Sequence, residues 1–161
     1  FNGIEEVSRN AKDLFVVRGP GEYEIQGVFV KGFASESQHS EKATINTMYT
    51  VRLEEMNILF LGALSDKKPD LSMIEDMDGV DVLFVPIGGN GALEAADAHA
   101  LAIALEAKVI IPIHYDGIGE KGALQTFLKE AGAEDVKPLD KLTIKKKDLE
   151  GKSGEVVVLA S

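Results

Sequence analysis

Hydrophobic and polar positions change period along the chain, from two residues in its first half to a helical spacing in parts of its second. Residues 46–55, NTMYTVRLEE, place Met48 and Thr50 on one side of an extended segment and Tyr49 and Val51 on the other. Residues 56–64, MNILFLGAL, follow at once. The two runs therefore predict a β-hairpin that turns near residues 54–57.

Two further strands are expected before this hairpin. LFVV at 14–17 is short and apolar, and YEIQGVFVKGF at 23–33 alternates between apolar and polar residues. Gly27 interrupts the alternation, and a glycine inside a strand often marks a bulge. We therefore expect one bulged strand over 23–33.

The second half of the chain alternates strands with helices. The pattern predicts helices from Pro69 to Gly79, over 92–106 and over 120–132, and strands over 80–89, 108–115, 141–147 and 154–161. A block of antiparallel strands followed by this alternation favours sheets covered by helices over an all-β sandwich or a helical bundle. The fold class is thus mixed α/β, in one domain spanning residues 1–161.

Two of the predicted strands end in the same way. VDVLFVPIGG and KVIIPIHY each carry aliphatic residues, then proline and isoleucine, then small or polar residues. Functional side chains gather on loops at strand ends in folds of this class. Gly88 and Gly89 would clear space there and His114 would point into it, where it could ligate a metal, act as a base, make structural hydrogen bonds or fill space.

Composition excludes several classes of function. The chain has 17 basic and 27 acidic residues, for a net charge of −10, and a field of that sign repels nucleic acids. The one dense basic run, at 141–152, is typical of a solvated strand edge and turn. The sequence has no cysteine, no apolar run that could cross a bilayer and no visible signal peptide, which is consistent with a cytoplasmic protein.

Five motifs in order resemble the metallo-β-lactamase-fold superfamily, most closely its small branch of predicted metal-dependent hydrolases. They are GPGEYEIQGV, NTMYTV, MNILFLGAL, VDVLFVPIGG and KVIIPIHY. The resemblance implies an αββα four-layer sandwich, with a metal site, usually zinc, at one rim of the sheets. It also implies that His114 is the last protein ligand of that site.

The chain departs from the family pattern at three places. The signature His-x-His-x-Asp-His is absent, so the chain resembles the C-terminal two-thirds of a member and its sandwich is expected to be incomplete at the N-terminus. Ala63 stands where the family has an aspartate that bridges two metals. The family histidine expected near Ser37 is missing, and His39, two residues on, could substitute or be an exposed loop residue.

Other polar residues near these motifs carry weaker signals. Asp116 follows His114 and could orient its imidazole, or be a turn residue beside Gly117. His99 lies among alanines of a predicted helix and is expected to be a packed helix residue. The sequence GGNGA at 88–92 lacks the Lys-Ser/Thr of a P-loop, so a phosphate site is only weakly indicated.

Three hypotheses for function remain open. The chain is a divergent relative of zinc-dependent hydrolases with a degenerate metal site, a metal-free binding or scaffold module, or a structural subunit of an assembly. A zinc ion is expected in a longer parent protein, but none bound tightly by this chain, because His114 and His39 alone fall short of three protein ligands. A small-molecule substrate, a protein partner and self-association are all compatible with the sequence.

Overall fold

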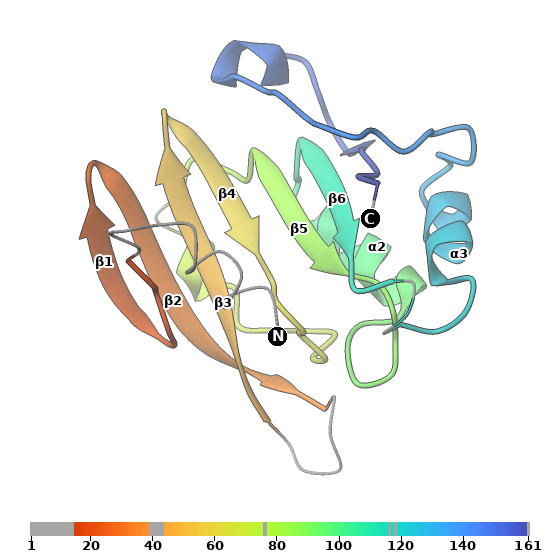
Figure 1. The fold of residues 1–161 in the computed structure, drawn as a ribbon, viewed down its shortest axis with the longest axis horizontal. Helices are drawn as coiled ribbons and strands as arrows, with labels where there is room; N and C mark the ends of the chain where they lie inside the picture. The colour runs from red at the N-terminus through yellow and green to blue at the C-terminus, as the bar shows by residue number, and fades with distance from the viewer. Residues whose placement is uncertain (1–14, 39–43, 76, 116, 118, 161) are drawn as a thin grey trace.

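The computed structural model of the chain describes residues 15–38, 44–75, 77–115, 117 and 119–160. The described residues form one seven-stranded mixed sheet, in which the strands lie side by side in the order of the sequence (Figure 1). The strands are β1 (Gly21–Ile25), β2 (Val28–Ser37), β3 (Thr44–Leu53), β4 (Met56–Phe60), β5 (Val82–Pro86), β6 (Val109–Ile113) and β7 (Glu155–Val156).

The first four strands pair antiparallel and the last four parallel. The predicted hairpin is confirmed, because β3 and β4 pair antiparallel and Glu54 and Glu55 turn between them with φ values of 48° and 62°. The predicted bulge at Gly27 is wrong. Gln26 and Gly27 have φ values of 52° and 81° and form a tight turn between β1 and β2, so the run 23–33 folds back on itself.

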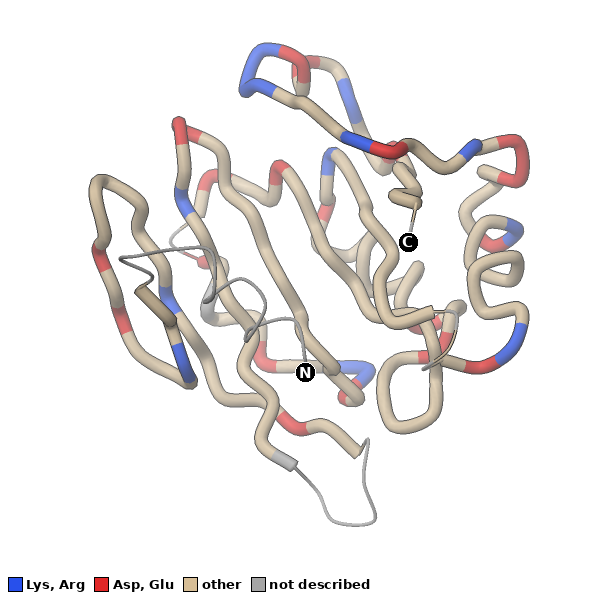
Figure 2. The backbone as a smooth tube through the Cα atoms, in the orientation of Figure 1, with Lys and Arg blue, Asp and Glu red and all other residues tan. Residues whose placement is uncertain are grey.

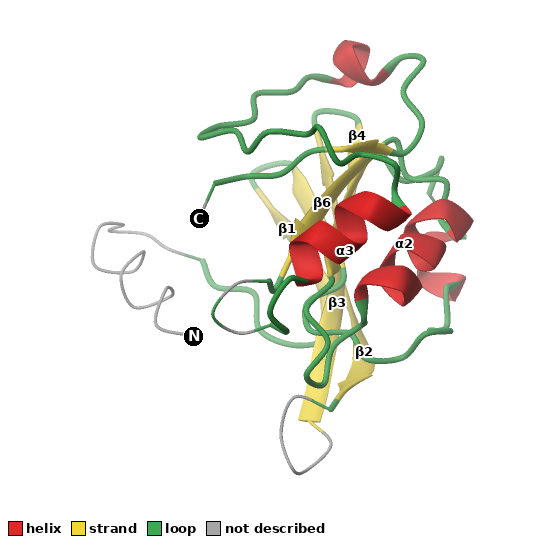
Figure 3. Ribbon diagram, turned by 90° about the vertical axis from the view of Figure 1, so that its right-hand side faces the viewer, coloured by secondary structure: helices red, strands yellow, loops and turns green. Residues whose placement is uncertain are grey.

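Helices α2 (Ala95–Ala104) and α3 (Ala123–Glu130) confirm two of the predicted helices and pack against each other (Figure 3). Their buried residues Leu101 and Phe127 belong to the same core as Leu59, Leu83 and Ile110 of the sheet. We call this side of the sheet the helical face. It is one sheet and one helical layer of the αββα arrangement.

The described residues cover the opposite side of the sheet, here called the open face, only in part. Leu142, Ile144 and Leu149 pack there on Val109 and Ile111. Over the antiparallel strands a shallow apolar hollow of about 370 Å³ remains, lined by Val17, Val30, Tyr49, Val51, Ile58, Phe60 and Phe84.

Two predicted elements are wrong in the described residues. Between Pro69 and Gly79 the described residues form only a 3-10 turn, η1 (Ser72–Ile74), because a segment this short gives an α-helix only marginal stability. Residues 141–147 form no strand and lead into η2 (Lys146–Leu149). The apolar side chains of this run bury themselves on the open face without a neighbouring strand.

The first and last predicted strands also differ from expectation. The described residues of the first, 15–17, form no strand, and the last is reduced to the two residues of β7. Val157 and Val158 nevertheless lie in opposite apolar clusters, so the alternation continues beyond the ladder. Among the described helices, none combines the length and the hydropathy that a membrane span requires.

One buried carboxylate, directly before β5, joins the starts of β4, β5 and β6. Asp81 is fully buried, and its Oδ1 and Oδ2 accept hydrogen bonds from Lys108 Nζ at 2.7 Å and Lys146 Nζ at 2.6 Å. The backbone N–H of Asn57 donates to Oδ2 at 2.8 Å. The lysine-rich segment 141–152 (Figure 2) therefore contributes a structural ion pair at Lys146.

Two opposing effects act on the pKa of the Asp81 carboxyl. Burial alone would raise it, but the hydrogen bonds from the two lysines and from Asn57 outweigh burial and lower it below its ordinary value. The ionised form is thus favoured by folding, and its contribution to stability is present above about pH 4.

The Asp81→Asn variant should lose about 3 kcal/mol of unfolding free energy, because the ion pairs disappear from a buried position. Because the folded pKa is lowered, the difference from the wild type should be constant above about pH 4 and shrink as the pH falls further. Urea unfolding at several pH values measures both effects. Asp78→Asn, at an exposed position, is the control and should change little; an equal loss in both variants would contradict the assignment.

The open face also bears on the expected self-association. Phe60 and Leu53 are 37% and 38% exposed, and the hollow beside Phe60 is apolar. Sedimentation velocity should show concentration-dependent association of the chain, which Phe60→Lys should reduce. A monomer at all concentrations would contradict this expectation.

Candidate functional site

The carboxyl ends of β4, β5 and β6 meet at one edge of the sheet, which we call the rim. The three strands are parallel and in register, so the loops that follow them begin at the same level. Backbone hydrogen bonds join these loops directly. Leu93 N–H donates to Leu64 O at 2.8 Å, and Ile87 N–H donates to Ile113 O at 3.0 Å.

The end of β2 joins the same rim. Gln38 N–H donates to Gly91 O at 3.0 Å, and the Ser37 hydroxyl lies 3.4 Å from the same oxygen. Ser65 N–H donates to Glu36 O at 3.2 Å. Four segments that are distant in sequence therefore form one continuous hydrogen-bonded surface.

Gly88 and His114 touch through their backbones. A Cβ atom on Gly88 would lie 1.9 Å from His114 O, so no other residue fits at position 88. His114 itself adopts a φ of 56°, in the left-handed region that L residues seldom occupy. Such strain persists only where the surroundings impose it, and it concentrates at functional sites.

Gly89 has a φ of 61° and lies against the carboxyl group of Glu120, which would be 3.0 Å from a Cβ at that position. Glu120 N–H also donates to Gly88 O at 2.6 Å. The loop after β6 thus returns across the two glycines, and it brings an acidic side chain to the rim that the sequence pattern did not indicate.

Ala63 lies on the loop after β4, where Asn46 fixes the backbone. Asn46 Oδ1 accepts from Ala63 N–H at 2.9 Å, and its Nδ2 donates to Leu61 O at 2.9 Å and to Ser35 Oγ at 2.8 Å. Sequence reasoning missed this role of Asn46. The available signal was a polar amide at the start of an otherwise apolar and threonine-rich strand.

The remaining residues singled out from the sequence are placed as follows. His39 and Asp116 lie outside the described residues. His99 is half-buried on α2, with its ring 6.1 Å from that of Phe127 in an edge-to-face arrangement, so its prediction as a packed helix residue is confirmed.

A family model described as the beta-lactamase superfamily domain matches residues 5–114, which is more than half of the chain. The chain belongs to this superfamily. Proteins of Listeria monocytogenes named metal-dependent hydrolase are 36% identical over 64 residues, which is 40% of this chain and 28% of theirs. One from Anoxybacillus flavithermus is 43% identical over 47 residues, 29% of this chain and 21% of its own. The match therefore spans less than a third of these relatives.

Solved structures confirm the metallo-β-lactamase fold. A candidate Zn-dependent hydrolase of that superfamily from Thermotoga maritima has a TM-score of 0.63 at 27% identity, over 91% of this chain and 72% of its own. A Bacillus subtilis protein of the fold has a TM-score of 0.60 at 13% identity, over 98% and 59% of the two chains. The second likeness concerns the fold alone.

Metal chemistry is therefore implied for the superfamily relatives, and the donor set of this chain can be tested against it. Within the described ranges, no three His, Asp or Glu side chains lie close enough together to hold a metal ion. A catalytic zinc ion needs three protein ligands. The described residues alone do not fit such a site.

Asn46→Ala should release the loop that carries Ala63. Three hydrogen bonds are lost and partly replaced by water, so we expect a loss of about 2 kcal/mol of unfolding free energy and faster amide exchange at Ala63. Asn46→Asp is the matched control, because it keeps an oxygen that accepts from Ala63 N–H and loses only the donors. Hydrogen exchange followed by NMR distinguishes them. Unchanged exchange at Ala63 in the alanine variant would contradict the role of Asn46.

Proposed function

We propose that the chain is part of a protein related to zinc-dependent hydrolases, to which it contributes His114 as one metal ligand and the floor of the site. The observation that carries the proposal is the left-handed backbone of His114, held against Gly88 where three parallel strands end. The relatives named metal-dependent hydrolase support the same assignment.

The proposed site is degenerate, with room for at most one metal. The loop after β4 carries no oxygen ligand at the level of Ala63, since its neighbours are Gly62 and the fully buried Leu64. The acidic residue farther along, Asp66, accepts a hydrogen bond from Lys68 N–H at 2.8 Å. A methyl group at position 63 cannot bridge two cations.

Further ligands would have to come from His39, from Asp116 or from a longer protein in which a His-x-His-x-Asp-His segment accompanies this chain. No catalytic step is assigned to the described residues, because they do not complete a metal site.

A second candidate function is a metal-free binding or scaffold module, or a structural subunit. It is favoured by the lack of a three-ligand cluster in the described residues and by Ala63. The two proposals differ in whether His114 takes part in zinc binding.

Zinc titration of the 161-residue chain should show weak binding with less than one equivalent retained, and His114→Asn should abolish it. Asparagine tolerates the left-handed backbone, so the variant removes the imidazole without adding strain. His99→Asn is the matched control and should retain the wild-type titration. Tight one-to-one binding would contradict the degenerate site, and zinc binding that is indifferent to His114 would contradict its role as a ligand.

The Ala63→Asp variant should behave differently in the 161-residue chain and in a longer protein. In the 161-residue chain the new carboxylate should lower the unfolding free energy by about 1–3 kcal/mol, with no recovery on adding zinc. In a longer protein that has the His-x-His-x-Asp-His segment, the same change should raise zinc affinity, and zinc should raise the melting temperature. The absence of any zinc-dependent difference in both backgrounds would mean that Ala63 does not occupy a vacated ligand position.

A further inference from the structure

A second cavity lies at the other end of the sheet, on a part of the helical face that neither α2 nor α3 covers. Its volume is about 550 Å³, within the range of small-molecule sites. Its floor is a row across three antiparallel strands, because Arg52 on β3 pairs with Phe29 on β2 and with Asn57 on β4. Asn57 lies at the start of β4, whereas Ala63 lies beyond the end of that strand, so the cavity and the rim are at opposite ends of β4.

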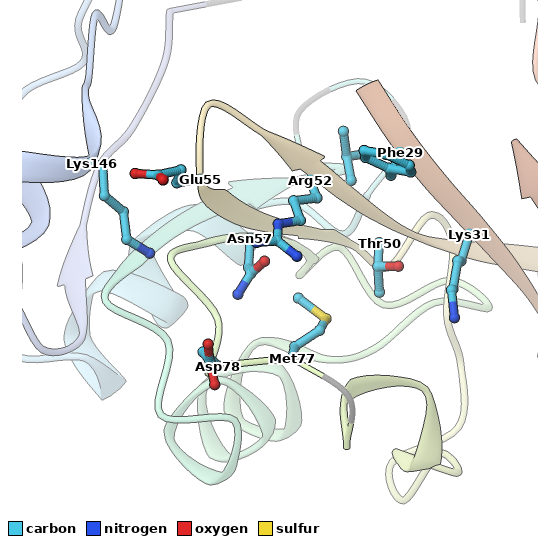
Figure 4. Close-up of a pocket in the computed structure, with 10 residues that line it drawn as sticks. Phe29, Lys31, Thr50, Arg52, Glu55, Asn57, Met77, Asp78 and Lys146 are labelled. Carbon is cyan, nitrogen blue, oxygen red and sulfur yellow. The ribbon is translucent and has the colours of Figure 1, made fainter. Parts of the chain in front are cut away.

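Two large apolar side chains line the cavity. They are Phe29, which is 49% exposed, and Met77 from the segment after η1 (Figure 4). An aromatic ring and a thioether offer an adaptable surface for an apolar group.

The charge in the cavity centres on Arg52. Its guanidinium lies between Asn57, Thr50 and Met77 in Figure 4. It has no ion pair or hydrogen bond in the part of the chain that the structure describes. The other two cations that line the cavity have acidic partners. Lys31 pairs with Glu22 at 3.2 Å, and Lys146 shares the single charge of Asp81 with Lys108.

A guanidinium without a partner among the described residues is notable in a chain with a net charge of −10. Thr50 lies two residues before Arg52 on the same face and is only 8% exposed. No described residue forms a hydrogen bond with its side chain. A guanidinium binds a carboxylate through two parallel hydrogen bonds, and a neighbouring hydroxyl can donate a third.

We propose that this cavity binds a small organic monocarboxylate with an aromatic or branched apolar group. The carboxylate binds Arg52 and Thr50, and the apolar group packs on Phe29 and Met77. Glu55 and Asp78 also line the cavity, so a second negative charge on the ligand is disfavoured. The site is independent of the rim and of the function proposed there.

Titration of the ¹⁵N-labelled 161-residue chain with phenylacetate tests the proposal. Amide shifts should move and saturate below about 10 mM at Phe29, Thr50, Arg52 and Met77, and not at Ala63 or His114. Phenylacetamide, which has the same shape without the charge, should bind at least about tenfold more weakly. Inorganic phosphate should cause no comparable shifts.

Matched variants identify the groups that recognise the ligand. Arg52→Gln should weaken phenylacetate binding about tenfold or more, and Thr50→Val should weaken it severalfold at nearly constant shape. Arg18→Gln removes a charge outside the cavity and should leave binding unchanged. Three results would overturn the proposal: no saturable shifts in the cavity, equal binding of phenylacetate and phenylacetamide, or equal loss in the Arg52 and Arg18 variants.

Discussion

The in-register parallel pairing of β4, β5 and β6 determines what lies at both ends of this sheet. Ile58 pairs with Val82 and Val82 with Val109, so the loops that follow the three strands begin at one level. That arrangement brings Ala63, Gly88 and His114 onto one rim. A slip of one residue in any strand would turn its apolar set from one face to the other, and both faces here bury apolar side chains.

Asp81 opposes such a slip from the other end. Its carboxylate accepts from the backbone of Asn57 at the start of β4 and from Lys108, which directly precedes β6. Lys146 adds a tie to the segment that covers the open face. Apolar packing tolerates small shifts, whereas three hydrogen bonds to one buried group specify a single alignment. Asp81 and its three hydrogen bonds therefore make the strand register more specific as well as more stable.

Periodicity predicted most strands and both α-helices, because their buried faces produce a strong repeat in the sequence. The errors have a common physical cause. Leu142 and Ile144 alternate like strand residues but find burial without a pairing strand, and backbone pairing leaves no trace in the side-chain pattern. Gln26 shows the converse. A non-glycine residue with positive φ converts an expected bulge into a turn, and local composition cannot distinguish the two.

The rim was anticipated from the shared endings of two strands and from a family resemblance, and the adjacency of Gly88 and His114 agrees with it. The expectation that Gly88 clears space for a site is wrong, because the backbone of His114 fills that space. The contributions of Asn46 and Glu120 were not anticipated, because each acts on a backbone that reaches it only through the fold. The two ends of the sheet also differ in kind. At the rim, backbone contacts are tight and glycine is required, which restricts the substitutions that could change the ligating residues. Around Arg52, exposed side chains on an open floor line a cavity that can change ligand by substitution without disturbing the register beneath it.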